Sequence, residues 1–274
     1  MNKMSALLLF TICALIPIAG AQTADELFDQ IQKLKSSPLQ PEPANEEEAK
    51  KAIAARITEI DGLSGQFQKS HGSDPRRWLL EYDAVESADI RKFAGIPALN
   101  EVEMKAVLDK IAAAPDAPAE LKASVAEQAA AIQMRTDLKT KPMELSFESS
   151  EGKKFDMADL RGKVVLIDFW ATWCPPCIEE IPNVVAVYNE FKDKGFTIVG
   201  ISLDQDLAKL AAFTKENNMP WIQYCDGKGW DSPMASKFSV TGIPEMWLVG
   251  KDGKVASFDA RADLRGQVAK LLGK

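Results

Sequence analysis

The sequence contains very little histidine and cysteine, the side chains that most often bind zinc. His71 is the only histidine, and the four cysteines are Cys13, Cys174, Cys177 and Cys225. A C-x-x-C pair that holds zinc needs a second pair or histidines to complete the usual four ligands. We therefore expect no metal and no other cofactor at Cys174 and Cys177.

The chain also lacks an excess of basic residues. Its 274 residues include 33 Lys and Arg against 40 Asp and Glu, and the net charge is -7. Binding to nucleic-acid phosphates requires clustered Lys and Arg. We therefore expect no nucleic-acid partner, and we interpret the adjacent Arg76 and Arg77 as part of a solvated turn.

Long apolar runs are scarce, and the first of them is at the N-terminus. Lys3 precedes an apolar stretch over 6–19, and Ala21 closes a small-x-small site. This order is typical of a signal peptide, residues 1–21, cleaved after Ala21. The stretch is shorter than the ~20 residues of a spanning helix and contains Pro17, which argues against a retained anchor.

Signal cleavage would place the mature protein in the periplasm or another extracytoplasmic compartment, where disulfides persist. Cys13 would be lost with the signal peptide. No later stretch is long and apolar enough to span a membrane. We therefore expect no stable membrane span in the mature protein.

Residues 22–140 favour helices, being rich in Ala, Glu, Lys, Leu and Gln. Asn45 is a suitable N-cap for a helix with an acidic first turn and one apolar stripe. Further helices are predicted from about 76 to 95, over 101–114 and from Pro118 to 138. The pattern predicts a helical domain of unknown role, and nothing in it indicates a repeat.

Residues 141–274 have a different pattern, in which strands alternate with helices. A hairpin around 150–152 precedes KVVLIDFW, a continuous apolar run that is typical of a strand buried on both faces. Two more strands alternate with helices, and a final hairpin and helix end the chain. This order predicts a mixed α/β sheet with an antiparallel end.

The stretch ATWCPPC places two cysteines where this buried strand gives way to a helix. A structural bridge between Cys174 and Cys177 would close a very small loop and gain little. At an exposed helix N-terminus, however, the Cys174 thiolate is stabilised, while Cys177 lies one turn further in. We therefore favour a redox pair over a zinc site or an inert crosslink.

DFWATWCPPC together with the later Gly242-Ile243-Pro244 resembles thioredoxin-fold proteins. The segments around both motifs resemble more specifically the extracytoplasmic TlpA/ResA-like thiol-disulfide oxidoreductases, over roughly 141–274. The resemblance implies a thioredoxin-like domain over 141–274, after the helical domain of 22–140.

The resemblance also implies roles for single residues. Cys174 would attack and Cys177 would resolve the mixed disulfide. Asp168 would be a buried carboxylate beneath the pair that takes the proton of Cys177. Glu180 would be an acidic residue beside the disulfide, and the alternative is a solvated carboxylate on the helix face.

Three further residues would form the substrate-binding surface of such a protein. Pro244 would be a cis-proline that leaves the Ile243 backbone free to pair with an extended client segment. Trp173 would shield the disulfide and offer an apolar docking surface. The alternative for Trp173 is simple packing.

Two residues depart from the family pattern. Glu245 stands where a small residue usually follows the cis-proline, and its carboxylate could raise the pKa of Cys174 or select basic partners. Cys225 ends an apolar strand, and its default interpretation is a buried free thiol. A third redox centre or an intermolecular disulfide is the alternative.

The C-x-x-C stretch favours a reductant or mild exchanger over a strong oxidant. Pro175 and Pro176 have no N–H to stabilise a thiolate at Cys174, and Glu180 and Glu245 add negative charge. The resemblance implies re-reduction by a membrane electron donor and client proteins bound through mixed disulfides, such as apocytochrome c.

Two other functions are compatible with the sequence. One is a peroxiredoxin-like thiol peroxidase, although such enzymes use a lone peroxidatic cysteine rather than a C-x-x-C pair. The other is a partner-binding protein in which the thioredoxin-like domain is only a scaffold.

Overall fold

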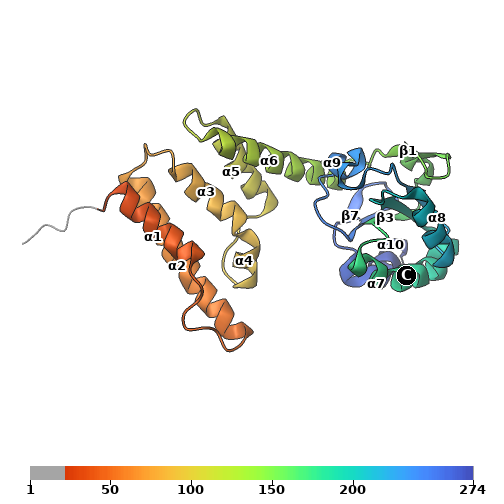
Figure 1. Ribbon diagram of the computed structural model, residues 1–274, viewed down its shortest axis with the longest axis horizontal. Helices are drawn as coiled ribbons and strands as arrows, with labels where there is room; N and C mark the ends of the chain where they lie inside the picture. The colour runs from red at the N-terminus through yellow and green to blue at the C-terminus, as the bar shows by residue number, and fades with distance from the viewer. Residues whose placement is uncertain (1–21, 274) are drawn as a thin grey trace, which may run out of the picture. The chain divides into compact units, whose positions relative to one another are not determined.

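The computed structural model describes residues 22–273 of the chain (Figure 1). The predicted signal peptide, with Cys13, lies outside the described residues. The chain divides into two compact units between Ala126 and Glu127, and each unit is described by itself. No helix within residues 22–273 combines the length and apolarity needed to cross a membrane.

The described residues of the first unit, 22–126, form only helices and the loops between them, as predicted. Its helices are α1 (Ala24–Ser36), α2 (Glu46–Ser70), α3 (Arg77–Glu86), α4 (Ala88–Phe93), α5 (Glu101–Ala113) and the start of α6 (Ala119–Thr140). Helices α1 and α2 lie side by side as a hairpin (Figure 1). A small core of Leu27, Ile31, Phe67 and Leu80 holds α1, α2 and α3 together.

Helix α2 begins where the sequence indicates. The Asn45 side chain accepts a hydrogen bond from the N–H of Glu48 at 2.9 Å, and the first turn is acidic. Such an N-cap stabilises a helix by about 1 kcal/mol. The predicted helix from 76 to 95, in contrast, is interrupted at Ser87, whose hydroxyl donates to the carbonyl of Asp83 at 2.6 Å.

Helix α6 is one unbroken helix, although the composition of the sequence changes only near residue 140. The structural division at Ala126 falls inside it. The reason is that Met134 and Leu138, in its last turns, pack on the hydrophobic cluster of the second unit. The end of α6 is therefore part of that unit.

The second unit contains a five-stranded mixed sheet in the order β5-β4-β3-β6-β7. Its strands are β3 (Val164–Trp170), β4 (Phe196–Ser202), β5 (Ile222–Tyr224), β6 (Glu245–Val249) and β7 (Val255–Ser257). Strands β3, β4 and β5 are parallel, and β6 is antiparallel to both β3 and β7. The predicted sheet with an antiparallel end is confirmed.

The remaining elements cover or flank this sheet. They are the hairpin β1 (Ser146–Glu148) and β2 (Lys154–Asp156), and the helices α7 (Pro175–Phe191), α8 (Leu207–Glu216), α9 (Pro233–Lys237) and α10 (Leu264–Leu272). Short 3₁₀ turns include η4 (Arg261–Asp263). This is the thioredoxin-like arrangement that the sequence predicts.

Strand β3 is buried along its whole length because apolar layers cover both of its faces. Val164, Leu166 and Trp170 belong to the cluster that includes α7 and the two cysteines. Val165, Ile167 and Phe169 belong to the opposite cluster, with the end of α6. Since side chains alternate along a strand, Asp168 points to the α7 face.

Candidate active site

The two cysteines lie at the start of α7 and are joined in a disulfide. Cys174 is the N-cap residue, and its sulfur accepts a hydrogen bond from the Cys177 N–H at 3.3 Å. Pro175 and Pro176 occupy the first helical positions, where the missing N–H is tolerated. The disulfide therefore lies at the positive end of the helix dipole, where a thiolate is stabilised.

Both cysteines are almost completely buried, whereas the sequence suggests an exposed helix start with Cys174 accessible. Cys174 is 4% exposed and Cys177 3% exposed. Part of the cover comes from the loop before β6, because the Cys174 sulfur lies 3.8 Å from the carbonyl oxygen of Ile243. The loop that contains Ile243 therefore closes off part of the access to Cys174.

The same loop contains the cis Ile243–Pro244 peptide bond that the resemblance implies. Ile243 is half-buried and packs against the hydrophobic clusters on both faces of the sheet. Its backbone thus lies beside the disulfide on a well-anchored segment. This arrangement suits pairing with an extended peptide.

Asp168 is a buried carboxyl group on the same face of the sheet as the disulfide. It is 6% exposed, and it lies in register between Gly200 of β4 and Met246 of β6. Burial raises its pKa to about 7, and the negative charge of Glu180 adds to the effect. A carboxyl group with this pKa can accept and release a proton near neutral pH.

Glu180 lies on α7, one turn beyond Cys177, and its side chain is only 18% exposed. The Asn183 amide donates to one oxygen, and the Arg261 guanidinium lies 3.6 Å from the other. The sequence leaves open whether Glu180 is a solvated surface residue. In the structure it is a half-buried, partnered carboxylate whose charge acts on Asp168.

Trp173 is fixed by a hydrogen bond and is still partly exposed to solvent. Its indole N–H donates to the carbonyl of Leu203 at 3.2 Å, and its side chain is still 45% exposed. The ring lies 6.2 Å from that of Trp230, which is 46% exposed. These two rings form an apolar surface at Trp173, the residue that precedes Cys174 in sequence.

Comparison with known proteins agrees with this geometry. Residues 133–258 match the family model described as AhpC/TSA family. The chain is 33% identical over 124 residues to the thiol-disulfide oxidoreductase ResA of Bacillus thuringiensis subsp. konkukian, covering 45% of this chain and 70% of that protein. The chain belongs to the ResA family of thiol-disulfide oxidoreductases.

A second ResA, from Bacillus cereus, is 36% identical over 105 residues, which are 38% of this chain and 59% of that protein. The chain thus spans 59% to 70% of the length of these two relatives. Among solved structures, the chain is similar to a thioredoxin-family thiol:disulfide interchange protein from Chlorobium tepidum TLS. There the identity is 29%, the TM-score 0.42, and the coverage 48% of this chain and 95% of that one.

The ResA-family disulfide is supported by a polar network that the sequence reasoning missed. The Asp204 carboxylate is 2% exposed and accepts from the Thr172 N–H at 2.9 Å and hydroxyl at 2.6 Å. The Ser202 hydroxyl donates to it as well, at 2.8 Å. The sequence contained an indication of this role for Asp204. An acidic residue just after a buried parallel strand lies at the carboxyl edge of the sheet, where functional groups gather.

Cys225 is a free thiol beside this network. It is 7% exposed and donates to the carbonyl of Asp204 at 3.2 Å. Burial raises the pKa of the Cys225 thiol. These features match the buried free thiol that the sequence predicts by default. We expect it to react slowly, because a protonated, enclosed thiol is a poor nucleophile.

Glu245, at the start of β6, is tied to its neighbours. The Trp247 indole N–H donates to its carboxylate at 2.6 Å, and the Arg135 guanidinium of α6 lies 3.9 Å away. Arg135 is a further residue that the sequence did not indicate. It belongs to a segment assigned to the helical domain and is distant from the cysteines in sequence.

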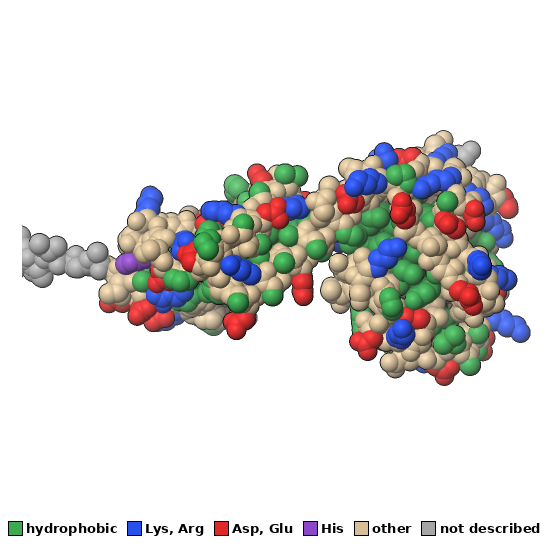
Figure 2. Space-filling model, turned by 90° about the horizontal axis from the view of Figure 1, so that it is seen from above, with side chains coloured by type: hydrophobic (Ala, Val, Ile, Leu, Met, Phe, Trp, Pro, Cys, Tyr) green, Lys and Arg blue, Asp and Glu red, His purple; other side chains and the backbone are tan. Residues whose placement is uncertain are grey.

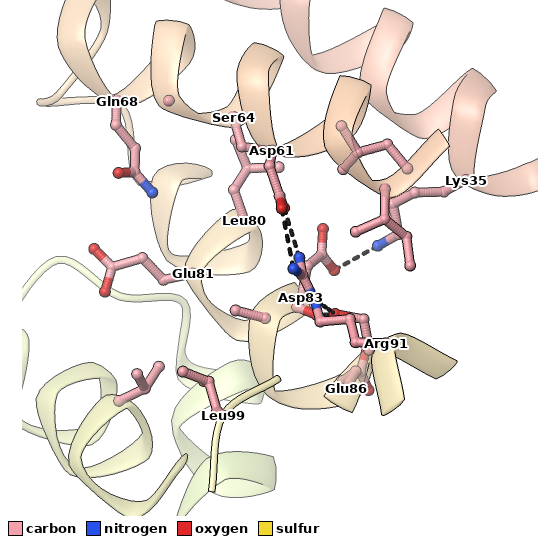
Figure 3. Close-up of a pocket in the computed structure, with 16 residues that line it drawn as sticks. Lys35, Asp61, Ser64, Gln68, Leu80, Glu81, Asp83, Glu86, Arg91 and Leu99 are labelled. Atoms are coloured by element: carbon pink, nitrogen blue, oxygen red, sulfur yellow. Dashed lines mark hydrogen bonds and ion pairs between the residues drawn. The ribbon is translucent and has the colours of Figure 1, made fainter. Parts of the chain in front are cut away.

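The helical unit has a pocket of its own, of about 500 Å³, among α1 to α5 (Figure 3). Its polar side chains mostly face one another: Lys35 pairs with Asp83 at 2.5 Å, and Arg91 pairs with Asp61. Burial raises the pKa of Asp83 against the opposing effect of Lys35. These pairs hold the helices together, and His71 lies outside this pocket at the end of α2.

Proposed function

We propose that this chain is an extracytoplasmic thiol-disulfide oxidoreductase that reduces disulfides in client proteins through Cys174 and Cys177. The observation that carries the proposal is the disulfide at the N-terminus of α7, packed against the cis Ile243–Pro244 loop. Membership in the ResA family supports it. The first 21 residues, whose pattern is typical of a signal peptide, are the reason to place it outside the cytosol.

The reaction consists of two thiol-disulfide exchanges. The thiolate of reduced Cys174 attacks one sulfur of the client disulfide, forms a mixed disulfide and releases the other client sulfur as a thiolate. Cys177 then loses its proton and attacks the Cys174 sulfur, which frees the second client thiol. The client gains two electrons and two protons, and the enzyme is left with the disulfide described above.

Asp168 is the group we propose for the proton of Cys177. It lies on the α7 face of β3 and has a pKa near 7, so that it is close to half-ionised at neutral pH. In the proposed mechanism it accepts the proton as Cys177 attacks. Glu180 would raise the proton affinity of Asp168 through its own charge.

The proposal includes two kinds of partner. Client proteins would pair with the Ile243 backbone, pack on Trp173 and pass through a mixed disulfide; apocytochrome c is the client that the resemblance implies. Each turnover leaves an oxidised enzyme that must be re-reduced, and the resemblance implies a membrane electron donor for this step.

Trapping tests this proposal directly. A Cys177→Ser variant cannot resolve the mixed disulfide and should accumulate it at Cys174 with a peptide that carries an oxidised C-x-x-C-H motif. The adduct should be released by dithiothreitol. The matched control is the Cys174→Ser, Cys177→Ser double variant, which should trap nothing. No adduct in the single variant would contradict the proposal.

The match to the AhpC/TSA family model supports a second candidate, a thiol peroxidase. A peroxidase consumes hydrogen peroxide at a single peroxidatic cysteine, whereas a protein-disulfide reductase needs both cysteines. Rapid peroxide consumption that persists in Cys177→Ser would favour the peroxidase.

If Cys174→Ser left the function in cells unchanged, a scaffold role would be favoured.

A further inference from the structure

A pocket lies at the cis-proline loop, next to the helix turn that carries the disulfide. It encloses about 470 Å³ and is lined by Arg135, Pro176, Arg261 and the segment 239–245. Pro176 stands between the two cysteines, and the segment includes Ile243, whose carbonyl oxygen is 3.8 Å from the Cys174 sulfur. A peptide that delivers its cysteine to Cys174 along this loop must therefore pass the mouth of the pocket.

Arg135 is held at this pocket by two contacts. Its guanidinium lies over the ring of Phe258, 4.2 Å from the centroid, and 3.9 Å from the carboxylate of Glu245. The side chain remains 37% exposed. Stacking occupies a face of the planar guanidinium, whereas its N–H groups point outward from the edge and can form a forked contact to a carboxylate.

Arg261 is the second cation of the pocket. Its Nε lies 3.6 Å from the Glu180 carboxylate, which is longer than a normal hydrogen bond, and its side chain is 46% exposed. Arg261 is thus loosely held and partly solvated. It can contact a second acceptor while its Nε stays near Glu180.

The charges that line the pocket favour an anion. The lining contains two cations, Arg135 and Arg261, and one anion, Glu245, whose carboxylate already accepts from the Trp247 indole. Glu180, which lies near Arg261, is not among the lining residues. The sequence suggested that Glu245 could select basic partners, but these contacts compensate its charge. A basic client side chain would instead meet two guanidinium groups.

We infer that this pocket binds an acidic side chain next to the reacting cysteine of the client, held by Arg135 and Arg261. The inference rests on the proposed disulfide reduction and adds a preference among its substrates. Through Arg135, the last turns of α6 would take a direct part in client recognition, although they precede the catalytic fold in sequence. Arg135 and Arg261 are specificity-determining residues and take no part in the exchange chemistry.

The test compares disulfide-bridged peptides that differ only in the residue beside one cysteine, which is Glu, Gln or Lys. One series varies the residue before that cysteine, and a second varies the residue after it. The rate constant for their reduction by the reduced protein is measured by stopped-flow tryptophan fluorescence. In at least one series the Glu peptide should react about two- to fivefold faster than the Lys peptide, as for partly exposed ion pairs.

Three variants show whether the pocket is responsible. The preference should disappear in the Arg135→Gln, Arg261→Gln double variant and persist in part in Arg135→Lys, which keeps the charge. The control is Arg265→Gln, which removes an exposed arginine paired with Glu190 on another surface. High salt should reduce the preference because it screens exposed charges.

Reduction of the neutral disulfide 4,4′-dithiodipyridine distinguishes a failure of the proposed function from a failure of the pocket to select clients. If the protein fails to reduce it, the proposed function fails. If the protein and both pocket variants reduce it equally, but Glu and Lys peptides react alike or the Lys peptide faster, only the inference about the pocket is overturned. A preference that survives in the double variant would overturn it as well.

Discussion

The carboxylate of Asp204 accepts hydrogen bonds from both the backbone N–H and the hydroxyl of Thr172, at 2.9 and 2.6 Å. Asp204 directly follows Leu203, just beyond the end of β4, and Thr172 is two residues before Cys174. The pair therefore ties the turn that carries the disulfide to the neighbouring strand. Trp173 strengthens the same connection through its bond to the carbonyl of Leu203.

This tie predicts that Asp204→Asn lowers both stability and activity. The NH₂ group of the new asparagine would replace an oxygen that accepts a hydrogen bond from Thr172. Two donors would then face each other, and buried polar groups would be left unsatisfied. We expect a loss of about 1–3 kcal/mol in the free energy of unfolding, measured in urea. Disulfide reduction should also slow, because the turn before Cys174 is no longer fixed.

Asp206→Asn is the matched control for this change. Asp206 is the exposed N-cap of α8, where Asn serves nearly as well, so both stability and activity should stay close to wild type. Equal effects of the two substitutions would show that the Asp204 network has no special role.

Asp168→Asn should stabilise the protein more at pH 8 than at pH 5. The pKa of Asp168 in the folded protein, about 7, is above the ordinary value of 3.8. The contribution of the protonated carboxyl group to the stability of the fold is therefore fully present below about pH 4 and is lost as the pH rises through 7. At pH 8 the charged group destabilises the fold by roughly 4 kcal/mol at 1.36 kcal/mol per pKa unit.

Denaturant unfolding at the two pH values measures this difference. The same variant should resolve mixed disulfides more slowly, because Asn cannot accept the proton of Cys177. If the stability change is the same at both pH values, Asp168 titrates as an ordinary carboxyl group, and its proposed role in proton transfer is wrong.

The disulfide should have a reducing potential, closer to that of thioredoxin at about -270 mV than to that of DsbA at about -120 mV. Pro175 and Pro176 have no N–H to offer the Cys174 sulfur, which receives the Cys177 N–H at 3.3 Å. Titration against glutathione measures the potential. A value near that of DsbA would contradict the proposed direction of electron flow.

Cys225 should be unreactive in the native protein and dispensable for reduction. In the oxidised chain from residue 22 onward, iodoacetamide should add no label at pH 7.5 and one label after unfolding, as counted by mass spectrometry. Cys225→Ala should reduce model disulfides at the wild-type rate. Rapid native labelling would favour the alternative of a third redox centre.

The visible surfaces of both units carry interspersed acidic and basic side chains (Figure 2), so net charge says little about local recognition. Composition excluded a broad basic surface, but the two arginines of the disulfide pocket became apparent only in the structure. Their effect depends on which carboxylates stand beside them. Net charge cannot reveal such pairing.

Local sequence pattern was sufficient to predict most of the helices and strands of both units. The apolar run of β3, the prolines at the start of α7 and the Asn45 cap act over a few residues, so the sequence predicts these elements well. The break at Ser87 was missed, because a serine bonded back to the preceding turn looks like any helical serine in sequence.

The sequence of this protein was enough to identify the redox pair, because a C-x-x-C motif between a buried strand and a helix is a local feature. It was also enough to suggest Asp168, since a carboxylate in an apolar strand must have a polar purpose. The surroundings of the pair depended on tertiary packing. Arg135, Thr172 and Asp204 lie on different elements, and only folding of the sheet and of α6 brings their charges and hydrogen bonds to the disulfide.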